Sequence, residues 1–331
     1  MAYYNPYRRL AEGGGKWLKC NFHVHNDIMP AEKKPQALIN ILKNYRAAGY
    51  DIIMNSEHHT YSDTSAAGAQ AGIKTFNGQE YIEKDGIALV GTKGLITGRP
   101  QEAVDKCAAD GGFSIVCHPN LNSGGGTNPH ILSKDEMLNL KGISGVEVVT
   151  GCLLRLAGTK MDLGSGFAYD IWDEMLTKGM IVWAFGNDDY HSVPDTDNGW
   201  TAIYAKSDSF ADVLESVREG CLYASSGPVL KRYEFDGEKI AVEAAYGKTA
   251  CDMLGERVGE EEAAKRDKAE EAAQGEQEKF EYRLIGKGGR LLSVQYGTTA
   301  AFDVVPGEPY LRVEAYGGYS ERLFTQPILA E

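Results

Sequence analysis

The stretch Cys20-Asn21-Phe22-His23-Val24-His25 organises the fold and the chemistry of this 331-residue chain. If residues 18–25 form a strand, alternation places His23 and His25 on one face and Phe22 and Val24 on the other. The two imidazoles then lie about 6–7 Å apart along the strand, a spacing that suits two ligands of one metal ion. Two histidines on a solvated strand face are the alternative. The positions of the other histidines favour the metal.

The composition is that of an ordinary globular protein. Hydrophobic residues make up 43% and charged residues 24%, which is enough apolar material for a full core. The net charge of −13 argues against nucleic acid and anionic membranes as partners. The N-terminus has no signal-like apolar region and no apolar run is long enough to span a membrane, so we expect a cytoplasmic protein. The six cysteines form no Cys-x-x-Cys pair, and we expect them to be reduced packing residues.

Strand-like and helix-like segments alternate along the first two thirds of the chain. Apolar strands are predicted at 18–25, 50–54, 113–117, 145–149, 181–185 and 200–205, and amphipathic helices at 35–48, 100–109, 169–178 and 209–218. This alternation predicts a mainly parallel α/β sheet. Beyond about residue 230 the pattern changes to short strands, which predicts a small β domain. A charged, helix-prone insertion at about 255–279 interrupts it.

Polar residues follow the ends of the predicted strands. Active sites of α/β barrels collect at that end of the strands, so the pattern favours a barrel-like arrangement. Imidazoles with carboxylates are the ligand set of Zn²⁺, Mn²⁺ or Fe²⁺, so we expect a divalent metal of this kind here. A centre of this kind activates water and polarises a phosphoryl or acyl oxygen. The residues concerned are His23, His25, Glu57, His58, Glu80, His118, Glu147, Asp189 and His191.

The order and spacing of these motifs resemble the PHP family, the polymerase and histidinol phosphatase domain. The matching segments are Trp17–His25, Gly49–His58, Asn77–Glu80, Cys117–Pro119, Gly145–Glu147 and Gly186–His191. The segments Glu219–Gly227, Tyr310–Glu314 and Gln326–Leu329 resemble the β appendage of one bacterial subgroup. The resemblance implies a distorted, TIM-like (β/α)7 barrel over residues 1–230 and a small β-rich domain over 231–331. It also implies phosphoester hydrolysis with up to three metal ions.

The resemblance further implies a ligand set. One ion would bind His23, His25, Glu80 and Asp189, a second would share Glu80 and bind His118, and a third would bind His58 and His191. Pro30 and Gly86 occupy positions where the family usually has further ligands. The candidates to replace those ligands or to orient the others are Asp27, Glu57, His59 and Glu147. The expected catalytic residues are Asp189, His191 and His58, and Arg99 and Arg155 are candidates for contact with a substrate phosphate.

The main hypothesis is therefore a metal-dependent phosphoesterase that hydrolyses a small phosphomonoester with metal-activated water. A PHP-like protein that binds a ligand or partner without turnover is an open alternative, because two expected ligand positions lack a side chain that can bind a metal. An amidohydrolase-like enzyme that cleaves C–N or C–O bonds is another, since such enzymes also pair His-x-His with later histidine and aspartate residues. Serine hydrolase chemistry is disfavoured because the chain has no Gly-x-Ser-x-Gly segment.

Overall fold

The computed structural model describes residues 2–26, 35–58, 60–61, 63–81, 86–121, 131–159, 164–246, 279–318 and 320–331. The helices are α1 (Arg8–Glu12), α2 (Pro35–Ala47), α3 (Ser65–Ala71), α4 (Pro100–Asp110), α5 (Lys134–Asn139), α6 (Gly151–Leu156), α7 (Tyr169–Thr177) and α8 (Phe210–Glu219). Short 3₁₀ turns lie at Val193–Asp195 and Lys287–Gly289.

The strands of the first part of the chain are β1 (Tyr3–Tyr4), β2 (Lys16–Val24), β3 (Ile52–Asn55), β4 (Lys74–Phe76), β5 (Gly78–Glu80), β6 (Ile87–Val90), β7 (Phe113–Val116), β8 (Gly145–Thr150), β9 (Trp183–Asn187), β10 (Trp200–Ala205) and β11 (Leu222–Ser225). Those of the C-terminal part are β12 (Pro228–Phe235), β13 (Lys239–Tyr246), β14 (Phe280–Gly286), β15 (Arg290–Gly297), β16 (Thr299–Asp303), β17 (Tyr310–Tyr316), β18 (Arg322–Thr325) and β19 (Ile328–Ala330).

Local sequence signals account for the helices that were predicted. Helix α4 begins with Pro100 at its first turn and ends at Gly111, whose φ of 89° is the left-handed conformation that glycine adopts without strain. Helix α8 follows Ser209, whose side chain accepts a hydrogen bond from the backbone of Asp212. Helices α3 and α6 were not predicted. They have seven and six residues, so they are too short to show the apolar period on which the prediction depended.

The strands form three sheets of 11, 5 and 3 strands. The largest has the order β1-β19-β17-β18-β11-β10-β2-β3-β4, with β14 pairing β17 and β15, and the others are β5-β6-β7-β8-β9 and β12-β13-β16. The expectation of a mainly parallel sheet was wrong. Only the pairs β2–β3, β3–β4, β7–β8 and β8–β9 are parallel among the described strands. Strand–helix alternation does not force parallel pairing where a long loop, such as 91–99 before α4, turns the chain before the helix begins.

The ladders do not close into a barrel within the described residues, so the (β/α)7 barrel is not confirmed and the fold is a mixed α/β arrangement. The five-stranded sheet meets the largest sheet through isolated bridges between Val24 and Tyr190 and between His58 and Glu80. Both bridges lie where strands end and candidate ligands begin. The two sheets nevertheless share an apolar cluster, in which the Phe22 ring of β2 lies 5.4 Å from Phe113 of β7 and 6.2 Å from Phe185 of β9.

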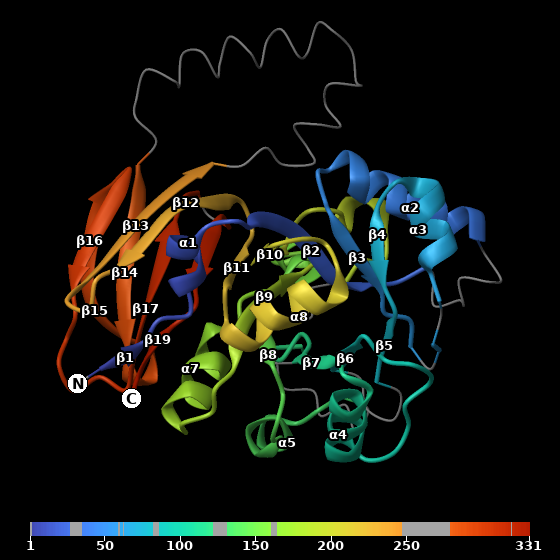
Figure 1. The fold of residues 1–331 in the computed structure, drawn as a ribbon, viewed down its shortest axis with the longest axis horizontal. Helices are drawn as coiled ribbons and strands as arrows, with labels where there is room; N and C mark the ends of the chain where they lie inside the picture. Colours follow the sequence, from blue (N-terminus) through green and yellow to red (C-terminus); the bar gives the residue numbers. More distant parts are fainter. Residues whose placement is uncertain are drawn as a thin grey trace, which may run out of the picture.

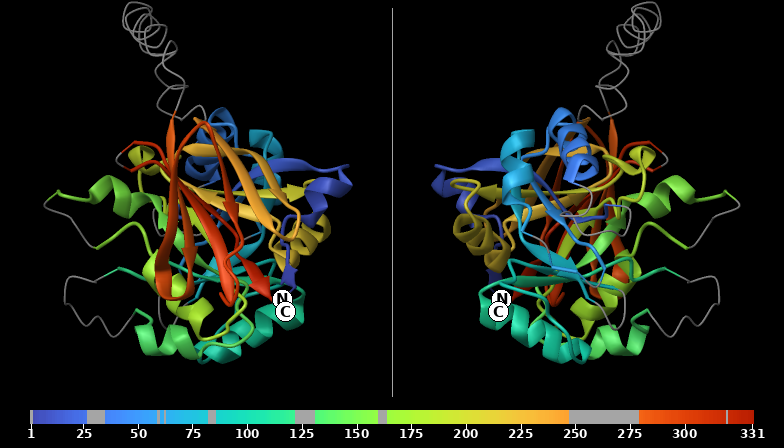
Figure 2. Two further views of the ribbon diagram at one scale, coloured as in Figure 1. Left: turned by 90° about the vertical axis from the view of Figure 1, so that its left-hand side faces the viewer. Right: turned by 90° about the vertical axis from the view of Figure 1, so that its right-hand side faces the viewer.

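The C-terminal strands gather at one side of the molecule and helices α2 and α3 lie at the opposite side (Figure 1). The turned views show these two sides in front (Figure 2). Strand β18 pairs with β11 and β1 pairs with β19, so the late strands extend the sheet that contains β2. The boundary between domains at residue 230 remains a prediction, and residues 255–278 of the charged insertion lie outside the described residues. No helix of the described chain is long and apolar enough to cross a membrane.

Candidate metal centre

The predicted ligands meet at the ends of five strands, β2, β3, β5, β7 and β9. His23 lies in β2 and His25 directly after it, while Glu80 is the last residue of β5. Asp189 follows β9 with a φ of 51°, a left-handed conformation that costs energy in a residue other than glycine and that collects at functional sites. Of the remaining histidines of the cluster, His58 follows β3, His118 follows β7 and His191 follows β9.

Glu80 is the centre of the cluster and is fully buried. Its Oε2 atom lies 3.2 Å from His23 Nε2, 3.3 Å from His25 Nε2 and 3.1 Å from His58 Nε2. Its Oε1 atom lies 3.0 Å from His118 Nε2. One carboxylate therefore faces four imidazoles, as expected for a bridging ligand.

Asp189 approaches the same two histidines from the other side. Its Oδ1 atom lies 3.1 Å from His23 Nε2 and 3.3 Å from His25 Nε2. The nearest nitrogen of His191 is 3.6 Å away from Oδ1. Cys152 donates a hydrogen bond from its thiol to Asp189 Oδ2 at 3.1 Å, which leaves Oδ1 turned toward the histidines.

Because these carboxylates and imidazoles are buried together, they shift one another's pKa values. Burial alone would raise the pKa of Glu80, but the charge of His23 and a hydrogen bond from His118 hold that pKa well below its usual value. Burial would lower the pKa of His25, yet the facing carboxylates of Asp189 and Glu80 raise it to about 9. Without a metal, protons on the imidazoles therefore balance the buried carboxylates.

The donor atoms fit a divalent ion. Two donors bound about 2.0–2.1 Å from one tetrahedral ion lie about 3.3 Å apart. The imidazole–carboxylate distances that join His23 and His25 to Glu80 and Asp189 are 3.1–3.3 Å. Both ring nitrogens of His25 are buried. Its Nδ1 atom has no hydrogen-bond partner among the described residues, and the contacts of Nε2 with Glu80 and Asp189 lack hydrogen-bond geometry. A metal would give one of them the partner that a buried polar atom requires.

Glu147 orients two of the candidate ligands. Its Oε1 atom lies 2.8 Å from His23 Nδ1, so a proton on Nδ1 leaves Nε2 free to bind a metal. Its Oε2 atom accepts a hydrogen bond of 2.7 Å from the backbone N–H of His118. Glu147 therefore lies behind the histidines and not among the donor atoms that face the centre. Of its two suggested roles, replacing a ligand and orienting one, this position fits the second.

The other candidates lie away from the donor atoms. Glu57 is buried and accepts a hydrogen bond from the Asn26 backbone, and it belongs to none of the metal-capable groups among the described residues. Gly86 contributes only its N–H, which donates to Glu80 Oε1 at 3.1 Å. Arg99 lies directly before α4 and forms an ion pair with Glu102. The Arg99 side chain is 84% exposed. Asp27, Pro30 and His59 lie outside the described residues.

Arg155 is connected to the histidine cluster through a buried carboxylate. Its Nε atom lies 2.5 Å from Asp195 Oδ1, and its side chain is 34% exposed. The other oxygen of Asp195 accepts a hydrogen bond from the backbone N–H of His191. Sequence reasoning did not identify Asp195, because only the folded loop shows that it holds both residues.

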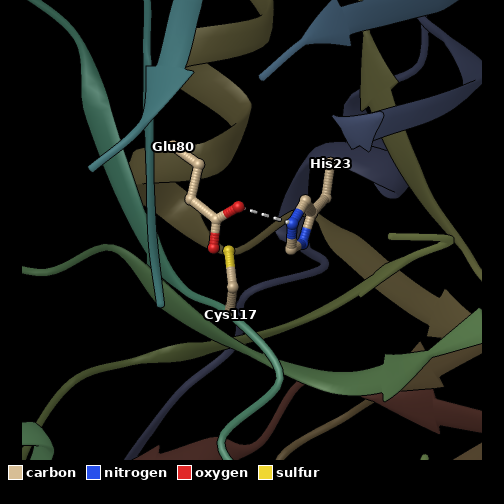
Figure 3. Close-up of side chains that lie close together, drawn as sticks. All are labelled: His23, Glu80 and Cys117. Atoms are coloured by element: carbon tan, nitrogen blue, oxygen red, sulfur yellow. Dashed lines mark hydrogen bonds and ion pairs between the residues drawn. The ribbon is translucent and has the colours of Figure 1, made fainter. Parts of the chain in front are cut away.

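Two cysteines that the sequence assigned to packing lie at this centre. The five cysteines of the described chain are free and buried, in agreement with that expectation, whereas Cys251 lies outside the described residues. Cys117, however, forms a metal-capable group with His23 and Glu80 (Figure 3). Cys152 contacts Asp189 as described above. The position of Cys117 directly before His118 was the one sequence signal that could have shown its place in the site.

No protein-family model and no curated protein matches this sequence. The structure is similar to the crystal structure of a two-domain protein that contains a predicted PHP-like metal-dependent phosphoesterase, from Bacteroides vulgatus ATCC 8482. The similarity covers 96% of each chain at 13% sequence identity, with a TM-score of 0.49. The family named for that protein is the one that the sequence motifs resemble. A similarity of this size carries no functional argument, so the proposals below rest on the side chains of this chain.

Proposed function

We propose that this protein is a metal-dependent hydrolase of phosphoesters and that its substrate is a small phosphomonoester. The observation that carries the proposal is the spacing of the donor atoms of His23, His25, Glu80 and Asp189, which is 3.1–3.3 Å between the imidazoles and the carboxylates. Zn²⁺, Mn²⁺ or Fe²⁺ suits a site of this composition. When bound there, such an ion polarises a phosphoryl oxygen and activates water.

His191 is placed to transfer a proton. Its side chain is 46% exposed, whereas those of His23 and His25 are fully buried. Its Nδ1 atom lies 2.9 Å from the backbone oxygen of Asp189, so a proton on Nδ1 leaves Nε2 available. Burial lowers the pKa of His191, which keeps the ring neutral near pH 7 and able to accept a proton from water.

Arg155 is the candidate for binding the substrate phosphate. Asp195 holds its Nε atom and also the backbone of His191, so the guanidinium and the proton-transferring imidazole are positioned by one carboxylate. A partly exposed guanidinium fixed in this way can bind two oxygens of a phosphate at once. Arg99 lacks a comparable connection to the centre, and its pairing with Glu102 supports a capping role instead.

We also propose that residues 1–230 and 231–331 are two domains and that the first is a distorted barrel. The bridges between Val24 and Tyr190 and between His58 and Glu80 support the barrel, because they join the edges of the two sheets that hold the ligands. The change from mixed helices and strands to strands alone after α8 supports the division.

The test combines metal analysis with an activity panel. We expect the purified protein to hold at least one Zn²⁺, Mn²⁺ or Fe²⁺ by plasma mass spectrometry and to release phosphate from small phosphomonoesters. A His23→Ala/His25→Ala variant should lose both properties. Glu102→Gln is the matched control at a distant surface site and should keep them. Bound metal without hydrolysis of any phosphoester would refute the proposal. Retained metal with amide or lactam hydrolysis would favour the amidohydrolase-like alternative.

A further inference from the structure

Two consecutive residues after β7 approach the candidate centre. His118 brings Nε2 to 3.0 Å from Glu80 Oε1. Cys117 places its sulfur with a carboxylate oxygen of Glu80 and a ring nitrogen of His23 in a group whose atoms all lie within 4.8 Å of one another. The thiol points toward both side chains (Figure 3). Neighbouring side chains of a straight strand face opposite sides. His118 has a φ of 29°, and this bend allows both residues to reach one site.

The Cys117 side chain lies where the apolar cluster of Phe22 and Phe113 borders the candidate centre. Cys117 is fully buried, and its thiol donates a long hydrogen bond of 3.6 Å to the Ile115 carbonyl. Of the five cysteines in the described ranges, it is the one that belongs to a metal-capable group. At the same centre the buried Nε2 of His25 lies 3.3 Å from Glu80 Oε2 and Asp189 Oδ1 without hydrogen-bond geometry, which is a second sign of an absent ligand.

Gly86, which pairs with Cys117 through the backbone, has no side chain that could bind a metal in place of the thiol. The backbone N–H of Cys117 donates to Gly86 O at 2.9 Å, so these two positions lie side by side. Gly86 has no side chain to offer, and its φ of 121° disfavours any other residue there. Of the described residues, Glu80 and the chain after β7 bring donor atoms to this edge of the centre.

We propose that Cys117 is a thiolate ligand of the metal centre, that it shares an ion with His23 and Glu80, and that it makes the centre select Zn²⁺ or Fe²⁺ over Mn²⁺ and Mg²⁺. The proposal rests on the metal centre of the proposed function. A metal–sulfur bond of about 2.3 Å and metal–nitrogen bonds of about 2.0–2.1 Å would hold the donors of this group at separations within the 4.8 Å limit that they already satisfy. The thiol proton is released to solvent as the ion binds. The selectivity follows because soft thiolates bind these metals better than hard, oxygen-preferring cations.

Cobalt substitution tests the proposal without reference to activity. The wild-type protein loaded with Co²⁺ should show visible d–d bands from the bound ion and a near-ultraviolet band from thiolate-to-cobalt charge transfer. Cys117→Ser should lose the near-ultraviolet band and keep visible bands. Cys107→Ser is the matched control, since Cys107 is also buried and free, but its thiol donates to the backbone carbonyls of Val90 and Phe113 and it belongs to no metal-capable group of the described chain. It should keep both sets of bands.

Competition between metals gives a second readout. We expect the preference of the protein for Zn²⁺ over Mn²⁺, measured by plasma mass spectrometry after equilibration with both, to fall at least about tenfold in Cys117→Ser. An unchanged preference would overturn the selectivity. If Cys117→Ser fails to fold, Cys117→Ala takes its place: loss of the near-ultraviolet band in it supports the proposal, and a wild-type spectrum without that band overturns it.

The outcomes separate this proposal from the function on which it rests. Visible bands without a near-ultraviolet band in the wild-type protein would overturn the role of Cys117 and leave the metal centre intact. A near-ultraviolet band that survives in Cys117→Ser would also overturn it. No cobalt binding at all, in the wild-type protein as in His23→Ala/His25→Ala, would refute the metal centre itself.

Discussion

Replacing Glu147 by glutamine changes one atom at the back of the centre and tests whether that carboxylate orients the ligands. Its Oε1 atom contacts His23 Nδ1 at 2.8 Å and accepts from Asn187 Nδ2 at 2.9 Å. Its Oε2 atom accepts from the backbone N–H of His118 at 2.7 Å and from Thr150 Oγ1 at 3.2 Å. All four partners are buried, so the carboxylate is matched to donors on both sides.

Glutamine cannot satisfy this set in either orientation. An amide nitrogen in place of Oε2 faces the N–H of His118. An amide nitrogen in place of Oε1 faces the Asn187 amide, which cannot turn over because its oxygen accepts a hydrogen bond of 2.7 Å from Phe22 N. In that orientation the glutamine amide would donate to His23 Nδ1. The ring proton would then lie on Nε2, the atom that faces the centre. Each buried donor left without a partner costs about 1–3 kcal/mol.

We therefore expect Glu147→Gln to lower the free energy of unfolding by about 2–4 kcal/mol and the metal affinity by about 10- to 100-fold. Urea denaturation of the metal-free protein measures the first quantity, and competition with a chromophoric chelator measures the second. Glu102→Gln makes the same chemical change at the exposed start of α4 and should leave the metal affinity unchanged. If Glu147→Gln binds metal as tightly as this control, Glu147 does not orient the ligands.

Two further predictions concern stability. The pKa of His25, about 9 in the folded protein, lies above its unfolded value of about 6.5, so its contribution is full below about pH 6.5 and is lost as pH rises through about 9. Thermal scans in chelator should show a melting temperature that falls over this range, and a flat profile would contradict the prediction. Asp173→Asn breaks the buried pair with Arg312, which has an N–O distance of 2.6 Å, and should cost about 3–5 kcal/mol in urea denaturation. The metal content should stay unchanged, since neither residue belongs to a metal-capable group of the described chain. A smaller cost would mean that Glu314, the second partner of Arg312, satisfies the guanidinium alone.

The helices that were predicted correctly have their sequence signals within the helix or directly beside it. Helices α2, α4 and α8 each have an apolar face, a first-turn proline or a capping serine at the start, and a glycine just after the end. Strand direction was predicted wrongly, because pairing depends on how long loops return the chain. The Val24–Tyr190 bridge, for example, joins residues far apart in the sequence.

The sequence by itself determined the types of donor and their places after strands, since imidazoles and carboxylates recur in a fixed order from His23 to His191. Only the tertiary structure decided how they are used. It put Glu80 at the centre, turned Glu147 to the back of His23, and brought the Cys117 sulfur into a group with both histidine and carboxylate. The physical reason is that side-chain type is a local property. Which donors face one another depends on contacts between strands that are distant in the chain and on backbone bends such as that at Asp189.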